Sequence, residues 1–595
     1  MSTASTDNAI LTFTVTANGN VLPTTYAILS VAVNKEVNRI ASAVIVIADG
    51  NAAGQDFDIS DTGDLIPGNT IEIDAGYDGG SDSIFQGVII KHSIKIKRNY
   101  SVLVIECRDT AVQMTTVKNN MYYSQVADSD VISQLLSNYS SITPDVSSTS
   151  VQHEELVQYN CTDWDFMLCR ADVNGMFCFN EDGQVTIAAP NFSGQPTFTA
   201  TFGINILEFD AEIDNRLQPT GVTATSWDYS QQNLISGVDA NDPGATTPGN
   251  LSASTLASEV ASTEIQLAHS GLIPQDELQN WANSKLLKSR LAKVRGSVTV
   301  MGTSDVSLGD IITLDGVGAR FNGNAYATGI RHTIEDGAWL TTLQFGIDPE
   351  WFAYSYDIRT NDAYTLLPGL QGLHIGTVTQ LENDPTGDNR IQVRIPIISN
   401  NDDGVWSRIA LLDAGNNRGS FFMPEINDEV IVGFINNDPR QSVVLGMLNS
   451  SANPAPLTAS NQNDQKGFFT RSNIQILFDD GKKNVLLQTP GGNQTFWDDN
   501  GQQIVIQDQN NNQITMNQQG ISIQDTNNNQ ITMDNSGISI QSQNDLTLQA
   551  QGDVKISGVN ISISASAQMK AEGQAGGQVS SSGNMVIQGA MVQIN

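Results

Sequence analysis

The sequence predicts a mainly β protein with a few helices: two similar β-barrels, a small OB-like barrel and a repetitive C-terminal needle. Three observations predict this fold. Short runs of alternating apolar and polar residues fill most of the chain, only three segments have helical spacing, and an explicit repeat occupies the C-terminal part. A chain of 595 residues is also too long for one hydrophobic core, so several domains are expected.

Residues 1–112 are expected to form the first β-barrel, because short β runs such as 11–15, 43–47 and 69–73 alternate with Gly, Asn and Asp. Residues 113–200 are expected to be a helical and hairpin insertion. One helix follows the acidic start 128–130, and a second follows a capping box of Thr162 and Asp165 and ends at Asn174-Gly175.

Residues 201–367 repeat the first pattern and predict a second β-barrel. Within it, 236–263 is rich in Ser, Ala, Thr, Gly and Pro and is expected to be a loop, and 275–295 is expected to be a helix. Four or five strands within 368–450 fit an OB-fold. A polar linker at 451–467 precedes the needle.

Residues 468–595 change character, because Asn, Gln, Ser, Thr and Gly dominate and strict alternation takes over. Residues 510–516 (NNNQITM) recur at 527–533, and 520–524 (GISIQ) recur at 537–541. Alternation places a row of aliphatic side chains on one face of each strand, and a single chain with strands this short cannot bury that row. Two or three copies wound together can, by closing a β-prism or β-helix without free edges. The alternatives are a disordered or amyloid-like tail and a single-chain β-helix stalk.

The net charge of −35, from 64 acidic and 29 basic residues, argues against a nucleic-acid partner, which requires a basic surface. The four cysteines form no CxxC pair and are expected to be buried thiols of a protein folded in a reducing cytoplasm. The first residues have no Sec-type pattern, and no apolar stretch of about 18 residues predicts a transmembrane helix.

The chemistry-bearing residues form no recognisable active site. His92, His153, His269, His332 and His374 are scattered, and there is no zincin, G-x-S-x-G or P-loop motif. Acidic pairs such as 402–403, 479–480 and 498–499 have turn-like contexts, which indicate solvated loops rather than glycosidase or cation sites. We therefore predict no catalytic, cofactor-binding or metal-binding residues, and expect that the protein is not an enzyme.

Three segments in the expected order carry a family resemblance. They contain the motif residues Phe85 and Gly87, then Asp163, Trp164, Asp165 and Phe166 followed by an Asn-Gly turn, then Pro424, Asp428, Glu429, Val430 and Gly446. Together they resemble the VgrG family and the hub and spike proteins of contractile phage tails. Trp164 and Phe166 are expected to pack in a core, with a direct partner contact as the alternative. Pro424, Asp428 and Glu429 are expected to set a turn and strand of the OB-fold, with an interchain role as the alternative.

The resemblance implies a homotrimeric spike at the front of the inner tube of a contractile injection system, which adapts a six-fold tube to a three-fold needle and punctures an envelope mechanically. It implies inner-tube and baseplate partners, a PAAR-like tip protein, transient contact with the target membrane and no cofactor. Met591, Val592 and Ile594 are the expected contacts of the tip protein, with closure of the trimer itself as the alternative.

The resemblance also implies synthesis in a bacterial cytoplasm, assembly into an injection particle and release from the cell. The class of machine stays open between a type VI system, an extracellular phage-like particle and a phage. Two other functions compete with this one: a glycan-binding tail fibre or adhesin with a β-solenoid stalk, and a spike-borne cell-wall hydrolase. The stretch between the OB-like barrel and the needle is too short for a lysozyme-like domain.

Overall fold

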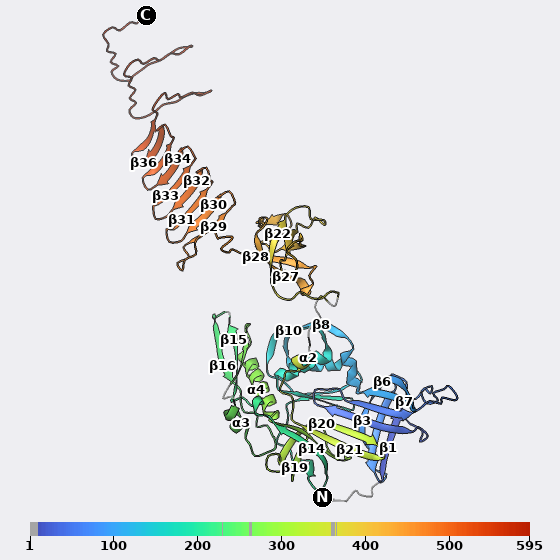
Figure 1. The fold of residues 1–595 in the computed structure, drawn as a ribbon. Helices are drawn as coiled ribbons and strands as arrows, with labels where there is room; N and C mark the ends of the chain where they lie inside the picture. Colours follow the sequence, from blue (N-terminus) through green and yellow to red (C-terminus); the bar gives the residue numbers. More distant parts are fainter. Residues whose placement is uncertain are drawn as a thin grey trace. The chain divides into compact units, whose positions relative to one another are not determined.

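The computed structural model describes residues 10–228, 230–260, 264–356, 358, 363 and 366–594 (Figure 1). The chain divides into two units. The first, here called the hub, comprises Met1–Gln371 and Asn436–Pro439, and the second comprises Gly372–Ile435 and Arg440–Asn595. The second unit contains a small barrel and the C-terminal sheet.

A 13-stranded sheet is the frame of the hub, and it contains strands from both predicted barrels. In order across the sheet, its strands are β14 (Ile206–Ile213), β18 (Val294–Met301), β21 (Ala338–Phe345), β20 (Gly323–Glu335), β3 (Ile28–Glu36), β4 (Ser42–Ala48), β7 (Tyr100–Arg108), β6 (Asp82–Lys97), β5 (Thr70–Tyr77), β1 (Leu11–Ala17) and β2 (Asn20–Val21), with β13 (Phe198–Thr201) and β19 (Ile311–Asp315) attached through β20.

The mainly β fold is confirmed, but the two groups of strands are joined rather than separate. Strand β20 is 13 residues long. Its first part pairs with β19, and its second part pairs with β21 on one side and β3 on the other, where Gly329 lies opposite Glu36. One long strand therefore belongs to both groups. Each group keeps its own hydrophobic core, which contains Ile45, Phe85 and Leu103 in the first and Val298, Leu314 and Phe345 in the second.

The insertion at 113–200 has a third core beneath two helices. Its elements are η1 (Thr110–Thr115), β8 (Lys118–Ala127), α1 (Asp128–Ser137), β9 (Thr143–Val146), β10 (Gln152–Thr162), α2 (Asp163–Val173), β11 (Phe177–Glu181) and β12 (Gln184–Ala188). The predicted cap of α2 is present, because the hydroxyl of Thr162 accepts from the backbone N–H of Asp165 at 3.1 Å. The predicted hairpin is formed by β11 and β12.

Two predictions for residues 201–367 are corrected. The helix expected at 275–295 ends earlier, as α4 (Gln275–Leu291), because Val294, Val298 and Val300 alternate into the core and their strand pairs with β14 and β21. The loop expected at 236–263 contains the end of β16 (Asn233–Asp239) and α3 (Ala253–Val260). Helix α3 begins where the Ser252 hydroxyl accepts from the N–H of Thr255 at 3.0 Å.

The remaining elements of the hub cover α4 and link it to the sheet. They are η2 (Asn215–Leu217), β15 (Val222–Asp228), β17 (Ile265–His269) and α5 (Phe352–Ser355). Strand β15 lies between β16 and β17, and this small sheet packs on α4 through Val222, Leu278 and Leu286.

The predicted OB-like barrel is present as a closed barrel in the order β22-β23-β24-β28-β27. Its strands are β22 (His374–Gln380), β23 (Ile391–Arg394), β24 (Val405–Ile409), β27 (Glu429–Phe434) and β28 (Ser442–Met447), with η4 (Ile435–Asn437) in the connection and a small hairpin of β25 (Ala414–Gly415) and β26 (Arg418–Gly419) outside the barrel. Val378, Val393, Val430 and Val432 are fully buried inside it.

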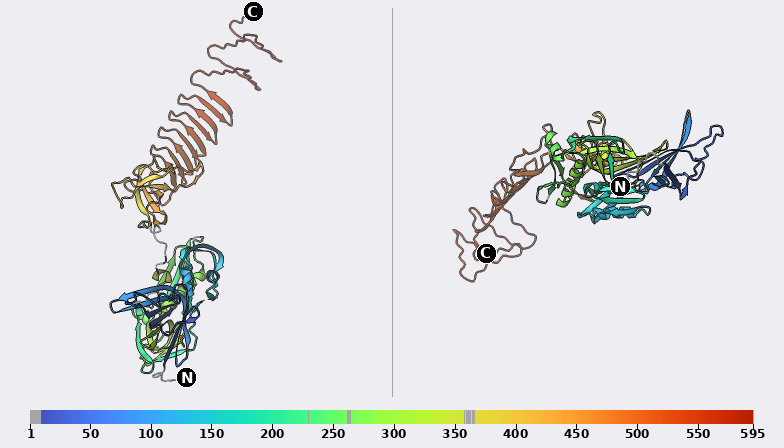
Figure 2. Two further views of the ribbon diagram at one scale, coloured as in Figure 1. Left: turned by 90° about the vertical axis from the view of Figure 1, so that its right-hand side faces the viewer. Right: turned by 90° about the horizontal axis from the view of Figure 1, so that it is seen from below.

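The C-terminal sheet is a nine-stranded antiparallel meander in which each strand pairs with the next along the chain (Figure 2). Its strands are β29 (Gln465–Phe469), β30 (Gln475–Asp479), β31 (Asn484–Gln488), β32 (Gln494–Asp498), β33 (Gln503–Gln507), β34 (Gln513–Asn517), β35 (Gly520–Gln524), β36 (Gln530–Asp534) and β37 (Gly537–Gln541). Residues 546–548, 554–556 and 559–563 also alternate apolar and polar side chains, as expected for strands that extend the needle, but they form no strand, since nothing within the described chain pairs with their backbones.

All four cysteines are free thiols. Cys107 and Cys178 are buried and Cys161 and Cys169 are half-buried, and burial raises the pKa of both Cys107 and Cys169 to about 12. These thiols are therefore protonated and unreactive at neutral pH. Within the described residues, no helix has the length and apolar character needed to cross a membrane.

Candidate functional site: the apolar face of the C-terminal sheet

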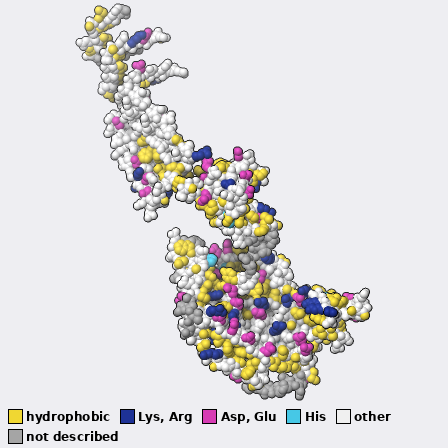
Figure 3. Space-filling model, in the orientation of Figure 1, with side chains coloured by type: hydrophobic (Ala, Val, Ile, Leu, Met, Phe, Trp, Pro, Cys, Tyr) yellow, Lys and Arg dark blue, Asp and Glu magenta, His cyan; other side chains and the backbone are white. Residues whose placement is uncertain are grey.

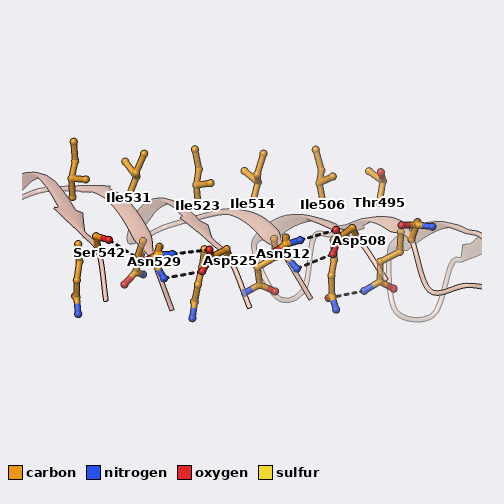
Figure 4. A pocket seen from close by; sticks show the side chains of 18 of the residues that line it. Thr495, Ile506, Asp508, Asn512, Ile514, Ile523, Asp525, Asn529, Ile531 and Ser542 are labelled. Atoms are coloured by element: carbon orange, nitrogen blue, oxygen red, sulfur yellow. Dashed lines mark hydrogen bonds between the residues drawn. The ribbon is translucent and has the colours of Figure 1, made fainter. Parts of the chain in front are cut away.

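Two rows of mostly apolar side chains follow one face of the C-terminal sheet. Cross-strand register defines the first row as Phe468, Ile476, Leu487, Thr495, Ile506, Ile514, Ile523, Ile531 and Ile540. The same register defines the second row as Phe478, Val485, Trp497, Ile504, Met516, Ile521, Met533 and Ile538. Figure 4 shows Thr495, Ile506, Ile514, Ile523 and Ile531 of the first row pointing to the same side.

The two rows have no core of their own in the single chain. No hydrophobic side chain among residues 468–594, all of them described, is buried. The first row lines an open groove of about 800 Å³ that extends from Leu487 to Leu546. Hydrophobic side chains are visible on the surface of this part of the chain in Figure 3. A monomer rarely leaves so long an apolar strip in water, so the face indicates an interaction surface.

Two loops at the ends of the strands beside the first row have the same hydrogen-bonded turn. The Asp508 carboxylate accepts from the backbone and side-chain amides of Asn512 at 2.9 and 2.8 Å, and Asp525 and Asn529 repeat this contact at 2.8 and 2.8 Å (Figure 4). These amides hold the pKa of both carboxyls below the ordinary value.

A ladder of glutamines follows one edge of the opposite face, where the sequence predicts a row of Ser, Thr, Asn and Gln. It consists of Gln475, Gln488, Gln494, Gln507, Gln513, Gln524, Gln530 and Gln541, one from each of eight consecutive strands. The signal is present in the sequence, because a glutamine begins or ends each of these short runs. Side-chain amides bridge neighbours in it, as between Gln475 and Gln488 at 2.8 Å.

The opposite face of the sheet differs from the purely polar face that alternation predicts. Its central row is apolar in the first strands and hydroxylic in the later ones, in the order Leu477, Leu486, Phe496, Val505, Thr515, Ser522, Thr532 and Ser539. The two apolar rows are therefore continuous along the whole sheet, whereas the other face becomes polar from β34 onward.

The predicted tip residues lie beyond the sheet. Met591, Val592 and Ile594 are exposed and belong to no strand of the described chain. Their predicted contact with a tip protein remains a prediction.

In the hub, Phe85 and Gly87 lie on β6. Phe85 is fully buried in the first core. A Cβ at Gly87 would lie 2.3 Å from the carbonyl oxygen of Arg108 on the neighbouring β7, so only glycine fits this close approach. This part of the motif shapes the sheet.

The second motif occupies the start of α2. The Asp163 carboxylate accepts from the side chains of Asn119, Gln158 and Tyr139, each at 2.8 Å. Burial and the neighbouring Asp163 raise the pKa of Tyr139 to about 12, so the phenol keeps the proton it donates. Trp164 and Phe166 lie in the third core, and Asp165 accepts from the Thr162 hydroxyl at 2.7 Å.

A buried ion-pair network connects α1, α2 and α4. Arg170 pairs with Asp128 at 2.6 Å and with Glu277 at 3.0 Å, and His153 lies 3.0 Å from Asp128. Burial opposes ionisation of Asp128, but hydrogen bonds from His153 and Arg170 outweigh it and hold the pKa of this carboxyl far below its ordinary value. The network ties the three helices together.

The third motif forms a turn and a strand of the small barrel. Pro424 is buried, and the Asp428 carboxylate accepts from the N–H of Glu425 at 2.8 Å. Glu429 begins β27, and Val430 is fully buried in the barrel core. A Cβ at Gly446 would meet no atom within 4 Å. Nothing within the single chain explains the glycine there.

Among the described residues, no group of three or more His, Cys, Asp or Glu side chains is placed to hold a metal ion. Asp479, expected in a solvated loop, instead ends β30 and is buried, with its carboxylate accepting from the side chain of Gln465 at 3.1 Å and the backbone N–H of Lys482 at 2.8 Å.

Comparisons with known families agree with the fold and with the apolar face. The small barrel matches the model of the type VI secretion system/phage-baseplate injector OB domain over residues 374–448. Residues 484–549, which begin with β31 and include both apolar rows from there onward, match the phage baseplate V C-terminal trimerisation domain. The chain is therefore a VgrG-like spike protein of the kind found in phage baseplates and type VI secretion systems.

The N-terminal part of the chain matches a further family model. Residues 7–336, more than half of the chain, match the model of the Alg8 N-terminal domain, and the chain belongs to that family.

Individual relatives are more distant. The type VI secretion system spike protein VgrG3 of Vibrio cholerae serotype O1 is 34% identical over 96 residues, and this match covers 15% of the present chain and 9% of the Vibrio protein. Among solved structures, the 43 kDa tail protein of prophage MuSo2 from Shewanella oneidensis has a TM-score of 0.44 at 9% identity, covering 57% of this chain and 98% of that chain.

A chain of the Francisella PdpA-VgrG complex has a TM-score of 0.38 at 10% identity, covering 87% of this chain and 80% of that chain. Both TM-scores lie below 0.5, so the family membership of the chain rests on the matches to the family models and not on these structures.

Proposed function

We propose that three copies of this chain wind their C-terminal segments together into a needle, and that the trimer is the spike at the tip of the inner tube of a contractile injection system. The spike adapts the six-fold tube to a three-fold needle and punctures the target envelope by mechanical force. The observation that carries the proposal is the pair of apolar rows, which extend together from β30 to β37 and are not covered by any described residue of the chain.

Energetics favour closure over an isolated sheet. Each large aliphatic side chain that leaves water contributes about 1.5–3 kcal/mol, and the rows supply such a side chain at nearly every strand. Three sheets that place these rows around a common axis bury them together and leave the glutamine ladder and the hydroxyl row outside. The match to a trimerisation domain over residues 484–549 supports a count of three.

The same proposal assigns the remaining parts. The hub contacts inner-tube and baseplate proteins, the OB barrels gather the three chains, and Met591, Val592 and Ile594 bind a PAAR-like tip protein. No catalysis is required, because sheath contraction supplies the work. Such a spike is made in the cytoplasm and leaves the cell as part of the assembled particle.

The mass of the purified chain in solution tests this proposal. Light scattering should give three times the chain mass for the full-length protein, and a smaller assembly after deletion of residues 468–595. A full-length protein that stays monomeric at micromolar concentration would contradict the proposal and favour a single-chain binding protein.

A further inference from the structure

The first apolar row does not stop at the boundary of the matched trimerisation segment. That segment begins at residue 484, but the row continues through Ile476 on β30 to Phe468 on β29. Phe468 then stacks on Phe422 of the OB barrel, with ring centroids 5.3 Å apart and an interplanar angle of 15°. The apolar row of the C-terminal sheet therefore ends on an aromatic side chain of another domain.

This aromatic pair is incomplete in one chain. Phe422 remains 52% exposed and Phe468 49% exposed although the two rings stack on each other. The adjacent Phe421 is 78% exposed, and Leu412, at the other end of the β25–β26 hairpin, is 91% exposed. The hairpin is held closed by the pair Asp413–Arg418 at 3.0 Å, which keeps both ends of this loop together. Four large apolar side chains are thus exposed, two in the aromatic stack and two at the ends of the neighbouring hairpin.

We propose that the Phe422–Phe468 pair, flanked by Phe421 and Leu412, packs against the same residues of two other copies and closes the proximal end of the trimer core. This inference rests on the proposed trimeric spike and names the OB-barrel side chains that take part in its interface. The occupant is a second copy of this chain, because the surface is continuous with the row that enters the trimerisation segment. Three-fold symmetry relates the equivalent side chains of the three copies, so those that face the axis meet one another there.

The contact also explains how force passes along the chain. The covalent connection between the OB barrel and β29 is residues 448–464, a polar stretch that contains no strand. A flexible connection of that length transmits little axial compression. The aromatic stack, with the ion pair Arg471–Glu425 at 2.8 Å beside it, joins the two domains directly. In the trimer, three such joints act as a rigid collar between barrel and needle.

Interchain crosslinking tests where the pair lies. Phe422→Cys is expected to form interchain disulfides on mild oxidation and to give a band of twice the chain mass on a non-reducing gel. Asn401→Cys, on another exposed loop of the OB barrel, is the matched control and should crosslink much more slowly. Equal rates for the two variants would overturn the inference.

Trimer stability gives a second, independent readout. Phe422→Ser should speed dissociation of the trimer on dilution by about ten-fold. Phe422→Leu keeps an apolar side chain and should dissociate at nearly the wild-type rate. Phe422→Ser and Phe468→Ser should be strongly non-additive, since both remove the same contact. If the wild-type chain is a monomer, the proposed function itself fails. If it is a trimer whose dissociation is unchanged by Phe422→Ser, only the present inference fails.

Discussion

Two glycines of the resemblance illustrate how differently the same residue type acts in two settings. Gly87 faces the backbone of Arg108, where an added Cβ would approach the carbonyl oxygen to 2.3 Å. Gly87→Ala should therefore force β6 and β7 apart and lower the stability of the hub by about 1–3 kcal/mol. The urea midpoint of the hub measures this loss.

Gly446→Ala provides the matched control, because a Cβ there meets no atom within 4 Å in the single chain. Its free energy of unfolding in the monomeric state, measured by urea denaturation, should be unchanged within a few tenths of a kcal/mol. A large loss from Gly446→Ala together with none from Gly87→Ala would contradict the structural account of both positions.

His332 predicts an acid sensitivity of the hub. The ring is buried beside Trp339 and 3.0 Å from the Thr341 hydroxyl, and burial, assisted by the nearby Lys35, lowers its pKa to about 3. The unfolded chain binds the proton near pH 6.5, so stability is complete above that value and is lost as the pH falls toward 3. At pH 5 the loss from this group amounts to about 2 kcal/mol.

The substitution His332→Gln removes this titration. The difference between the free energies of unfolding at pH 7 and pH 5, measured by urea denaturation, should shrink by about 2 kcal/mol. The variant is also less stable than the wild type at neutral pH. His269→Gln, at an exposed position, should leave the difference unchanged. An undiminished pH dependence in His332→Gln would show that other groups cause it.

At the scale of the element, the two faces of β35 have opposite roles. Ile523 belongs to the first apolar row, and its neighbour Ser522 points to the hydroxylic face. Ile523→Asp would place three carboxylates in the proposed trimer core and should abolish the trimer at micromolar concentration. Ser522→Asp adds the same charge to the outside and should preserve it. Light scattering of the two variants distinguishes them, and equal behaviour would contradict the assignment of the faces.

The C-terminal sheet is the element that the sequence predicts best. Its strands are local, and each pairs with the next through short turns, so alternation and repeat suffice to define its two apolar rows. The apolar side chains on the opposite face, such as Phe496, were not predicted. Alternation indicates which face of the sheet a side chain lies on, but not whether that face is polar along its whole length. The stack of Phe422 on Phe468 was equally invisible, since no periodicity connects the two domains.

Long-range pairing explains the larger differences in the hub. Strand β20 pairs with β3, nearly 300 residues earlier in the chain, and no local pattern encodes that partner. The helix expected at 275–295 ends at Leu291 for a similar reason, because pairing with β14 and β21 outweighs helical spacing. The Ser- and Ala-rich composition concealed α3, whose cap at Ser252 is visible only in the structure.

At the scale of the whole molecule, the hub and the C-terminal sheet differ in what stabilises them. The hub strands surround cores within one chain, as β4 shows with Ala43, Ile45 and Ile47 fully buried. The C-terminal sheet has hydrogen-bonded strands but no core, and an uncovered single layer opens readily. In the proposed spike, its stability therefore depends on association and hence on chain concentration.

Hydrogen exchange measured over a range of chain concentrations tests this dependence. For a trimer that dissociates as it opens, each ten-fold dilution lowers the free energy of opening by about 2.7 kcal/mol of trimer. Peptides from residues 484–541 should therefore lose protection as the sample is diluted below the dissociation range. Peptides from β4 serve as the internal reference and should keep theirs, because their core lies within one chain. Protection of 484–541 that is high and independent of dilution would mean that the sheet is stable alone, and the two apolar rows would then need a partner other than further copies of this chain.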